Sequence, residues 1–142
     1  MATIPFGVSR LDGRIGGGAP EGSVVLLSGE AGAGAREFAY TSAVLNGLQS
    51  ADPDLFDLHY GDLHGNAVAP EDIHYVSFTA DEAELQREIS FTLDEEIVDA
   101  GLDAVSFGPL PGVLPVESGA AGVVRGRTPD HHGPRAVGRG AP

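Results

Sequence analysis

Apolar and polar positions along the first hundred residues follow two alternating patterns, one typical of strands and one of helices. The run Val24-Val25-Leu26-Leu27-Ser28 is apolar and rich in β-branched residues, and it ends at Gly29. Such a run is typical of a strand buried on both faces of a parallel sheet. Residues 36–48 follow with apolar positions at helical spacing, and this pattern ends at the polar residues 49–53. A strand followed by a helix predicts a βα unit.

A second unit of the same kind follows an acidic, turn-rich connection over residues 52–70, which includes a short predicted helix around residues 54–58. Residues 73–78 (IHYVSF) then predict a second strand. The sequence therefore predicts an α/β fold with parallel strands and intervening helices.

The helix predicted after this strand runs from Asp81 to Gly101. Thr79 or Asp81 can cap its first turn, because their side-chain oxygens accept hydrogen bonds from unpaired N–H groups. Gly101 is expected to follow its last turn as a left-handed residue. The apolar positions fall four residues apart, at Leu85, Ile89, Leu93 and Ile97.

The character of the chain changes near residue 105. Residues 1–104 hold 19 of the 21 acidic residues, whereas residues 105–142 hold two acids and four of the eight arginines. The second part is rich in Gly and Pro and has no strand or helix periodicity, so it lacks apolar surface to offset its ordering entropy. We predict a partial domain over residues 1–104 and a disordered tail over residues 105–142.

An alternative origin for the tail is a shift of reading frame. Residues 108–124 can be back-translated with permitted codons and read one base later, which yields a peptide rich in acidic and aromatic residues that contains Trp. Synonymous codons make such a result easy to obtain. The two hypotheses, a native disordered tail and a frame-shifted segment, both remain open from the sequence.

The charge of the chain limits its partners. The formal net charge is −13, and all eight basic residues are arginine. This charge opposes binding to nucleic acid or to anionic lipid, and an acidic chain without lysine is typical of halophilic microbes, where salt screens self-repulsion.

The absence of cysteine excludes disulfides and thiolate metal sites. No signal segment and no apolar run of about 18 residues is present, so a cytoplasmic protein is expected.

Three consecutive segments carry a resemblance to a known family. They are Phe6-Gly7-Val8-Ser9-Arg10-Leu11-Asp12, then residues 16–23 (GGGAPEGS), then the predicted strand with Gly29-Glu30-Ala31-Gly32-Ala33-Gly34. Together they resemble the opening of RecA/KaiC-like P-loop ATPases, and within that family the small HTR-like proteins of halophilic archaea. The resemblance covers roughly residues 4–104 and implies an incomplete RecA-like P-loop domain.

The phosphate-binding loop implied by the resemblance lacks two of its three functional parts. Such a loop needs inward backbone N–H groups, a Lys on the β- and γ-phosphates and a hydroxyl on Mg²⁺. Ala35 occupies the position of the lysine and Arg36 that of the Ser or Thr. Arg36 would approach from a different side of the helix and cannot ligate the metal. The candidate nucleotide-binding residues are Gly29, Gly32, Ala33, Gly34, Ala35 and Arg36.

Two further departures concern catalysis. The family tends to carry paired glutamates after its next core strand, where this chain has Thr79 and Ala80, with a carboxylate only at Asp81. The aspartate expected at the end of a later strand has no counterpart, since Asp103 does not end an apolar run. We therefore expect no catalytic residues.

Candidate metal ligands are weak. His59, His64 and His74 lie near Asp57 and Asp62 in the sequence, but the first two histidines lack the i,i+4 spacing of a helical pair. A solvated loop is favoured over a metal site. The acidic run 94–96 is interpreted as an exposed helix face.

These observations predict a catalytically inactive RecA/KaiC-like protein rather than an enzyme, with a regulatory or interaction role through a protein partner or self-association, or a truncated product without activity. The alternative is an ATP-binding protein that retains weak nucleotide affinity through the altered loop. No cofactor is expected under the first hypothesis, whereas the second requires ATP with Mg²⁺. A DNA-binding role rests on fold analogy alone and is opposed by the charge.

Overall fold

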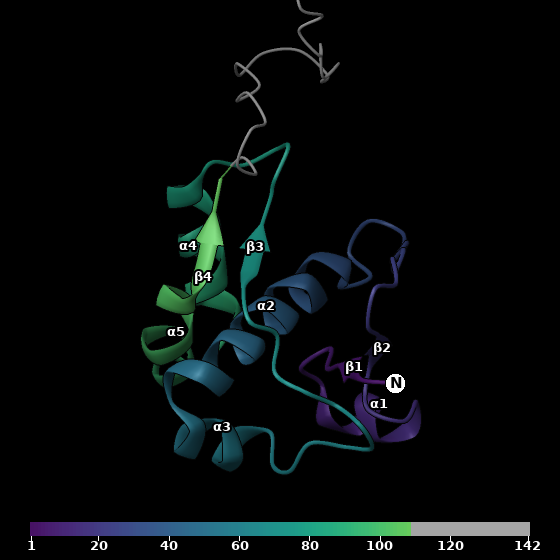
Figure 1. Ribbon diagram of the computed structural model, residues 1–142. Coiled ribbons are helices and arrows are strands. Elements are labelled where there is room, and N and C mark those ends of the chain that lie inside the picture. Colours follow the sequence, from purple (N-terminus) through teal and green to yellow (C-terminus); the bar gives the residue numbers. More distant parts are fainter. Residues whose placement is uncertain (109–142) are drawn as a thin grey trace, which may run out of the picture.

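The computed structural model describes residues 1–108, and Figure 1 shows their arrangement. The N-terminal part holds a short antiparallel pair, β1 (Thr3–Ile4) and β2 (Ala19–Pro20), with helix α1 (Ser9–Arg14) between them. Thr3 also forms a parallel bridge with Ala67 of the later connection. The conformation expected for the tail cannot be compared with the structure, since residues 109–142 lie outside the described part.

Helix α2 (Ala35–Ala51) is the centre of the fold. Its buried face presents Tyr40, Val44, Leu45 and Leu48. Of the apolar positions that predict this helix, Leu45 and Leu48 are buried, whereas positions 38, 39 and 43 are partly exposed. Helix α3 (Pro53–His59) follows after a sharp turn at Asp52, whose carboxylate accepts a hydrogen bond from the Leu55 N–H at 3.1 Å. These two helices confirm the expectations for residues 36–48 and 54–58.

A parallel two-stranded sheet lies beside α2. Strand β3 (Ile73–Tyr75) pairs with β4 (Val105–Phe107), with Ile73 opposite Val105. The mixed α/β class with parallel strands is therefore confirmed in its coarse form. Residues 105–107, which the sequence assigns to the tail, form β4, and Val105 is buried.

The long helix predicted from Asp81 to Gly101 is two helices, α4 (Glu82–Thr92) and α5 (Glu95–Gly101). The backbone turns to an extended conformation at Leu93, and Asp94 precedes the first turn of α5. Asp81 caps α4 as predicted: its carboxylate accepts from the Glu84 N–H at 2.9 Å, and the Glu84 side chain accepts from the Asp81 N–H. A short 3₁₀ turn, Leu102–Ala104, joins α5 to β4.

Gly101 does not have the left-handed conformation predicted for it, since its φ is −97°. Its function is close packing, because a Cβ at Gly101 would lie 2.7 Å from the carbonyl oxygen of Val44. A Cβ at Gly47 on α2 would lie 2.5 Å from the carbonyl oxygen of Gly101. The two glycines therefore let α2 and α5 approach until their backbones meet.

The strand predicted at residues 24–28 is absent from the fold. The run is exposed along its whole length and forms no ladder with another described strand. The apolar pattern predicted burial, but a strand also needs a neighbour for its backbone groups, and residues 1–108 supply none.

Within residues 1–108, no helix combines the length and the apolar character needed to cross a membrane.

Candidate functional site

The candidate phosphate loop is a turn that leads directly into α2. The Ala33 N–H donates to the Glu30 carbonyl at 3.0 Å, and Gly32 and Gly34 have φ of 81° and 88°. Gly34 is the N-cap residue of α2, and no side chain caps the helix there. Ala35 and Arg36 are the first two residues of the helix. The predicted strand is missing, but the predicted turn and helix start are confirmed.

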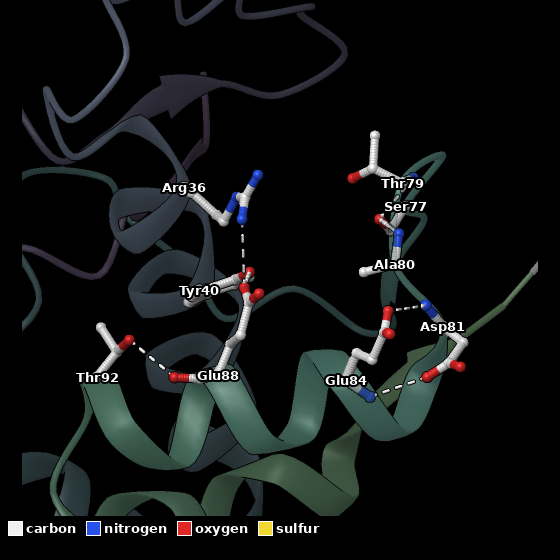
Figure 2. Close-up of polar contacts among 9 residues, drawn as sticks. All are labelled: Arg36, Tyr40, Ser77, Thr79, Ala80, Asp81, Glu84, Glu88 and Thr92. Atoms are coloured by element: carbon white, nitrogen blue, oxygen red, sulfur yellow. Dashed lines mark hydrogen bonds and ion pairs between the residues drawn. The ribbon is translucent and has the colours of Figure 1, made fainter. Parts of the chain in front are cut away.

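Arg36, the cationic residue at the start of α2, is already paired. The Arg36 Nη1 lies 3.5 Å from the Glu88 Oε2 on α4, and the Tyr40 hydroxyl donates a hydrogen bond to the same carboxylate oxygen (Figure 2). Arg36 and Glu88 are both more than one-third exposed, so the ion pair contributes little to stability. The ion pair instead orients the Arg36 side chain, so that its guanidinium group points toward α4. The sequence motif contains no sign of Glu88, which lies 52 positions later.

Three carboxylates lie in or near the segment that begins α2. Glu30 lies in the turn, Glu37 in the first turn of the helix, and Glu88 beside Arg36. The Glu37 Oε2 lies 4.0 Å from the position that a Cβ on Gly34 would occupy. Three carboxylates against one paired arginine oppose an incoming polyphosphate, although the helix N-terminus itself attracts anions. The described residues of this turn therefore supply no unpaired cation for a polyphosphate.

The segment after β3 is arranged by its own hydrogen bonds. The Ser77 hydroxyl accepts from the backbone N–H groups of Thr79 at 3.3 Å and Ala80 at 3.1 Å, and Asp81 is engaged as the cap of α4 (Figure 2). Thr79 is exposed. Asp103 lies in the 3₁₀ turn before β4 rather than at the end of a strand.

Asp12, at the end of the first resemblance segment, is the centre of a buried hydrogen-bond network that sequence reasoning missed. Its side chain is fully buried and accepts from the Phe6 N–H at 2.9 Å, the Gly7 N–H at 3.1 Å and the Tyr60 hydroxyl at 2.7 Å. These bonds join α1 to the end of α3. The aspartate of the motif therefore has a structural function in this chain.

The glycine triplet of the second segment also serves packing. A Cβ at Gly17 would lie 2.4 Å from the His64 carbonyl oxygen, and a Cβ at Gly18 would lie 2.0 Å from the Ile4 carbonyl oxygen. Both residues have positive φ. Only glycine permits this backbone conformation and this close approach together.

The three candidate histidines have different surroundings. The His59 Nε2 lies 3.5 Å from the Glu96 Oε1, the His64 Nε2 lies 3.1 Å from the Ser9 hydroxyl, and His74 is in β3. In the part of the chain that the structure describes, no group of three or more His, Asp and Glu side chains could hold a metal ion.

Two buried tyrosines make stability sensitive to high pH. Burial, followed by the hydrogen bonds to Asp12 and Glu88, raises the pKa of Tyr60 and of Tyr40 above the ordinary phenol range. The native state therefore keeps protons that the unfolded chain loses near pH 10, so their stabilisation is complete below that pH and is lost as the pH rises above it. Urea titrations from pH 8 to pH 11 should show a falling free energy of unfolding, by up to about 1.4 kcal/mol per pH unit for each tyrosine. The free energy of unfolding of the Tyr60→Phe variant should fall less steeply with pH. An unchanged slope would contradict the assignment of this pH dependence to Tyr60.

Comparisons of the chain with protein-family models, with curated proteins and with solved structures give no match.

Proposed function

We propose that this chain is a non-hydrolysing interaction protein built on a partial RecA/KaiC-like framework. The observation that carries the proposal is the Arg36–Glu88 ion pair at 3.5 Å, which occupies the only cation at the start of α2. Phosphoryl transfer depends on positive charge placed where negative charge develops in the transition state. Here that position has Ala35 and three nearby carboxylates, so the arrangement opposes the reaction.

An interaction role fits the surface of the chain better than a catalytic role does. Large apolar side chains are exposed along residues 24–27 and at Phe78 and Phe91. Exposed apolar groups of this kind favour contact with another protein surface. The net charge of −13 disfavours nucleic acid as the partner.

Weak ATP binding is the second candidate function, and one observation favours it. Gly32 and Gly34 already adopt positive φ, and the first turn of α2 lacks a side-chain cap, so its N–H groups can face an anion. Under this alternative, Arg36 would leave Glu88 when nucleotide binds.

Nucleotide titration separates the two functions. In molar KCl with Mg²⁺, the parent chain should show no saturable binding of a fluorescent ATP analogue at submillimolar concentration. The double variant Ala35→Lys with Arg36→Thr should gain at least about tenfold in affinity, because it restores the missing charge and hydroxyl on a turn whose glycines already have the required conformation.

Glu88→Gln is the matched control, since it releases Arg36 without adding a lysine. Saturable binding by the parent would favour the second function. Absence of any gain in the double variant would mean that the turn is not preformed for phosphate.

A further inference from the structure

The apolar run Val24–Leu27 is exposed in an alternating manner. Val24 and Leu26 are 97% and 91% exposed, whereas Val25 and Leu27 are 53% and 50% exposed. This is the period of two that a strand has, with one Val and one Leu on each face. Within residues 1–108, the backbone groups of the run make no hydrogen bond to other backbone groups. Such a segment is a template for strand addition.

Charge indicates which partner the run can accept. Residues 22–29 (GSVVLLSG) carry no charge, whereas residues 1–108 as a whole hold 19 acidic residues and four arginines. Two copies of this chain that met through most other surfaces would bring carboxylates together. The uncharged window is eight residues long, and it ends at Glu21 and Glu30. It is therefore a place where two copies can meet with little repulsion.

We propose that residues 22–29 form an interface between two copies of this chain, in which the two runs pair as antiparallel strands about a two-fold axis at Val25. When this axis is perpendicular to the plane of the two paired strands, one residue lies directly opposite the same residue of the second copy. With Val25 at the centre, Val24 lies opposite Leu26 of the second copy, so the two most exposed side chains become cross-strand neighbours.

In this register the nearest acidic residues of the two copies, Glu21 and Glu30, are one position out of line and point to opposite faces. Counting outward from Val25, Glu21 lies opposite Gly29, and Glu30 lies opposite Pro20. No carboxylate therefore faces another across the paired strands. The apolar centre and the uncharged ends make the segment complementary to itself.

The contact is small, and its strength depends on salt. Two paired segments of eight residues bury less surface than the roughly 1,200 Å² of a stable complex, so the association is weak. In molar KCl the Debye length falls to about 3 Å, which removes most of the repulsion between two acidic bodies. Association should therefore increase from low to high salt.

This proposal rests on the interaction role above, because it names the partner in that interaction. Its test involves no nucleotide, so a failure here leaves the measurement of hydrolysis untouched. The two proposals can therefore fail separately.

Single thiols test the proposal directly, because the chain has no cysteine of its own. Residues that lie opposite each other in an antiparallel pair have Cα atoms about 4.5–5.5 Å apart, which a disulfide can join. Val25→Cys should therefore cross-link to itself under mild oxidation in molar KCl. Ser28→Cys is the register control, since the two copies of position 28 would lie about 20 Å apart. Phe91→Cys is the control for an exposed apolar position on another element, since Phe91 is 86% exposed on α4.

The expected result is that Val25→Cys forms the disulfide dimer about tenfold faster than either control, because paired strands hold the two thiols at millimolar effective concentration. The rate should fall at low salt, and it should fall to the control rate when Leu26→Asp is added. Cross-linking of Val25→Cys no faster than that of the controls would overturn the proposal, and it would indicate that the run is covered within one chain or by another partner. Faster cross-linking at position 28 would overturn the register.

Discussion

Asp12→Ala should lower the free energy of unfolding by about 3–5 kcal/mol, because two buried donors and one partly buried donor lose their acceptor. The Asp12 side chain is fully buried, and its partners are the N–H groups of Phe6 and Gly7 and the Tyr60 hydroxyl. A loss of this size is a large part of the stability of a small domain. Urea denaturation in molar KCl, followed by circular dichroism, measures it.

The matched control for this prediction is Asp57→Ala. Asp57 is an exposed aspartate on α3, so its removal should change the stability by less than about 0.5 kcal/mol. Equal effects of the two substitutions would mean that Asp12 matters only through the net charge of the chain.

Gly47→Ala should destabilise the chain by about 1–3 kcal/mol, through overpacking where α2 crosses α5. The direction is informative, because alanine in place of glycine inside a helix ordinarily stabilises by about 1 kcal/mol. A Cβ at Gly47 would lie 2.5 Å from the Gly101 carbonyl oxygen and 3.3 Å from the Ala104 Cβ. The helix must therefore move away from α5 to accommodate it.

Ser50→Ala is the control, because it removes only the hydroxyl that donates to the Gly47 carbonyl at 3.1 Å and adds no atom where α2 crosses α5. It should change the stability by less than about 0.5 kcal/mol. Thermal unfolding of both variants at one salt concentration gives the comparison. A stabilised Gly47→Ala variant would contradict the close crossing of α2 and α5.

The helices were predictable from the sequence where their signals are local. Asp81 and Glu84 supply a capping box within four residues, and Pro53 follows the Asp52 cap directly. The break at Leu93 was missed because Leu85, Ile89, Leu93 and Ile97 continue one apolar face across it. The acidic residues 94–96 were a competing signal, since such residues are favoured in the first turn of a new helix.

The strand at residues 24–28 could not be decided from local sequence. A run of Val and Leu has side chains that are favoured in a sheet. Strand formation also requires pairing with a second strand, which the local sequence does not identify. The run therefore predicted a buried strand where the described residues leave it exposed.

The candidate site was predictable only in part, because only some of its features depend on local sequence. The turn at residues 29–34 and the start of α2 follow from glycine spacing, which is local. The contacts that determine its chemistry are distant in sequence, since Glu88 reaches Arg36 from α4 and Tyr60 reaches Asp12 from 48 positions away. In the sequence Asp12 is one position of a motif, and only the structure identifies it as the buried acceptor of three hydrogen bonds.

Phosphate release is the most direct test of the proposal that this chain does not hydrolyse ATP. Purified chain is incubated with ATP and Mg²⁺ in molar KCl, with Arg36→Ala assayed in parallel to reveal a trace ATPase in the preparation. The account predicts phosphate release no greater than that of the Arg36→Ala sample, because Ala35 supplies no charge and Arg36 is paired with Glu88. Turnover by the parent chain that Arg36→Ala abolishes would contradict the account.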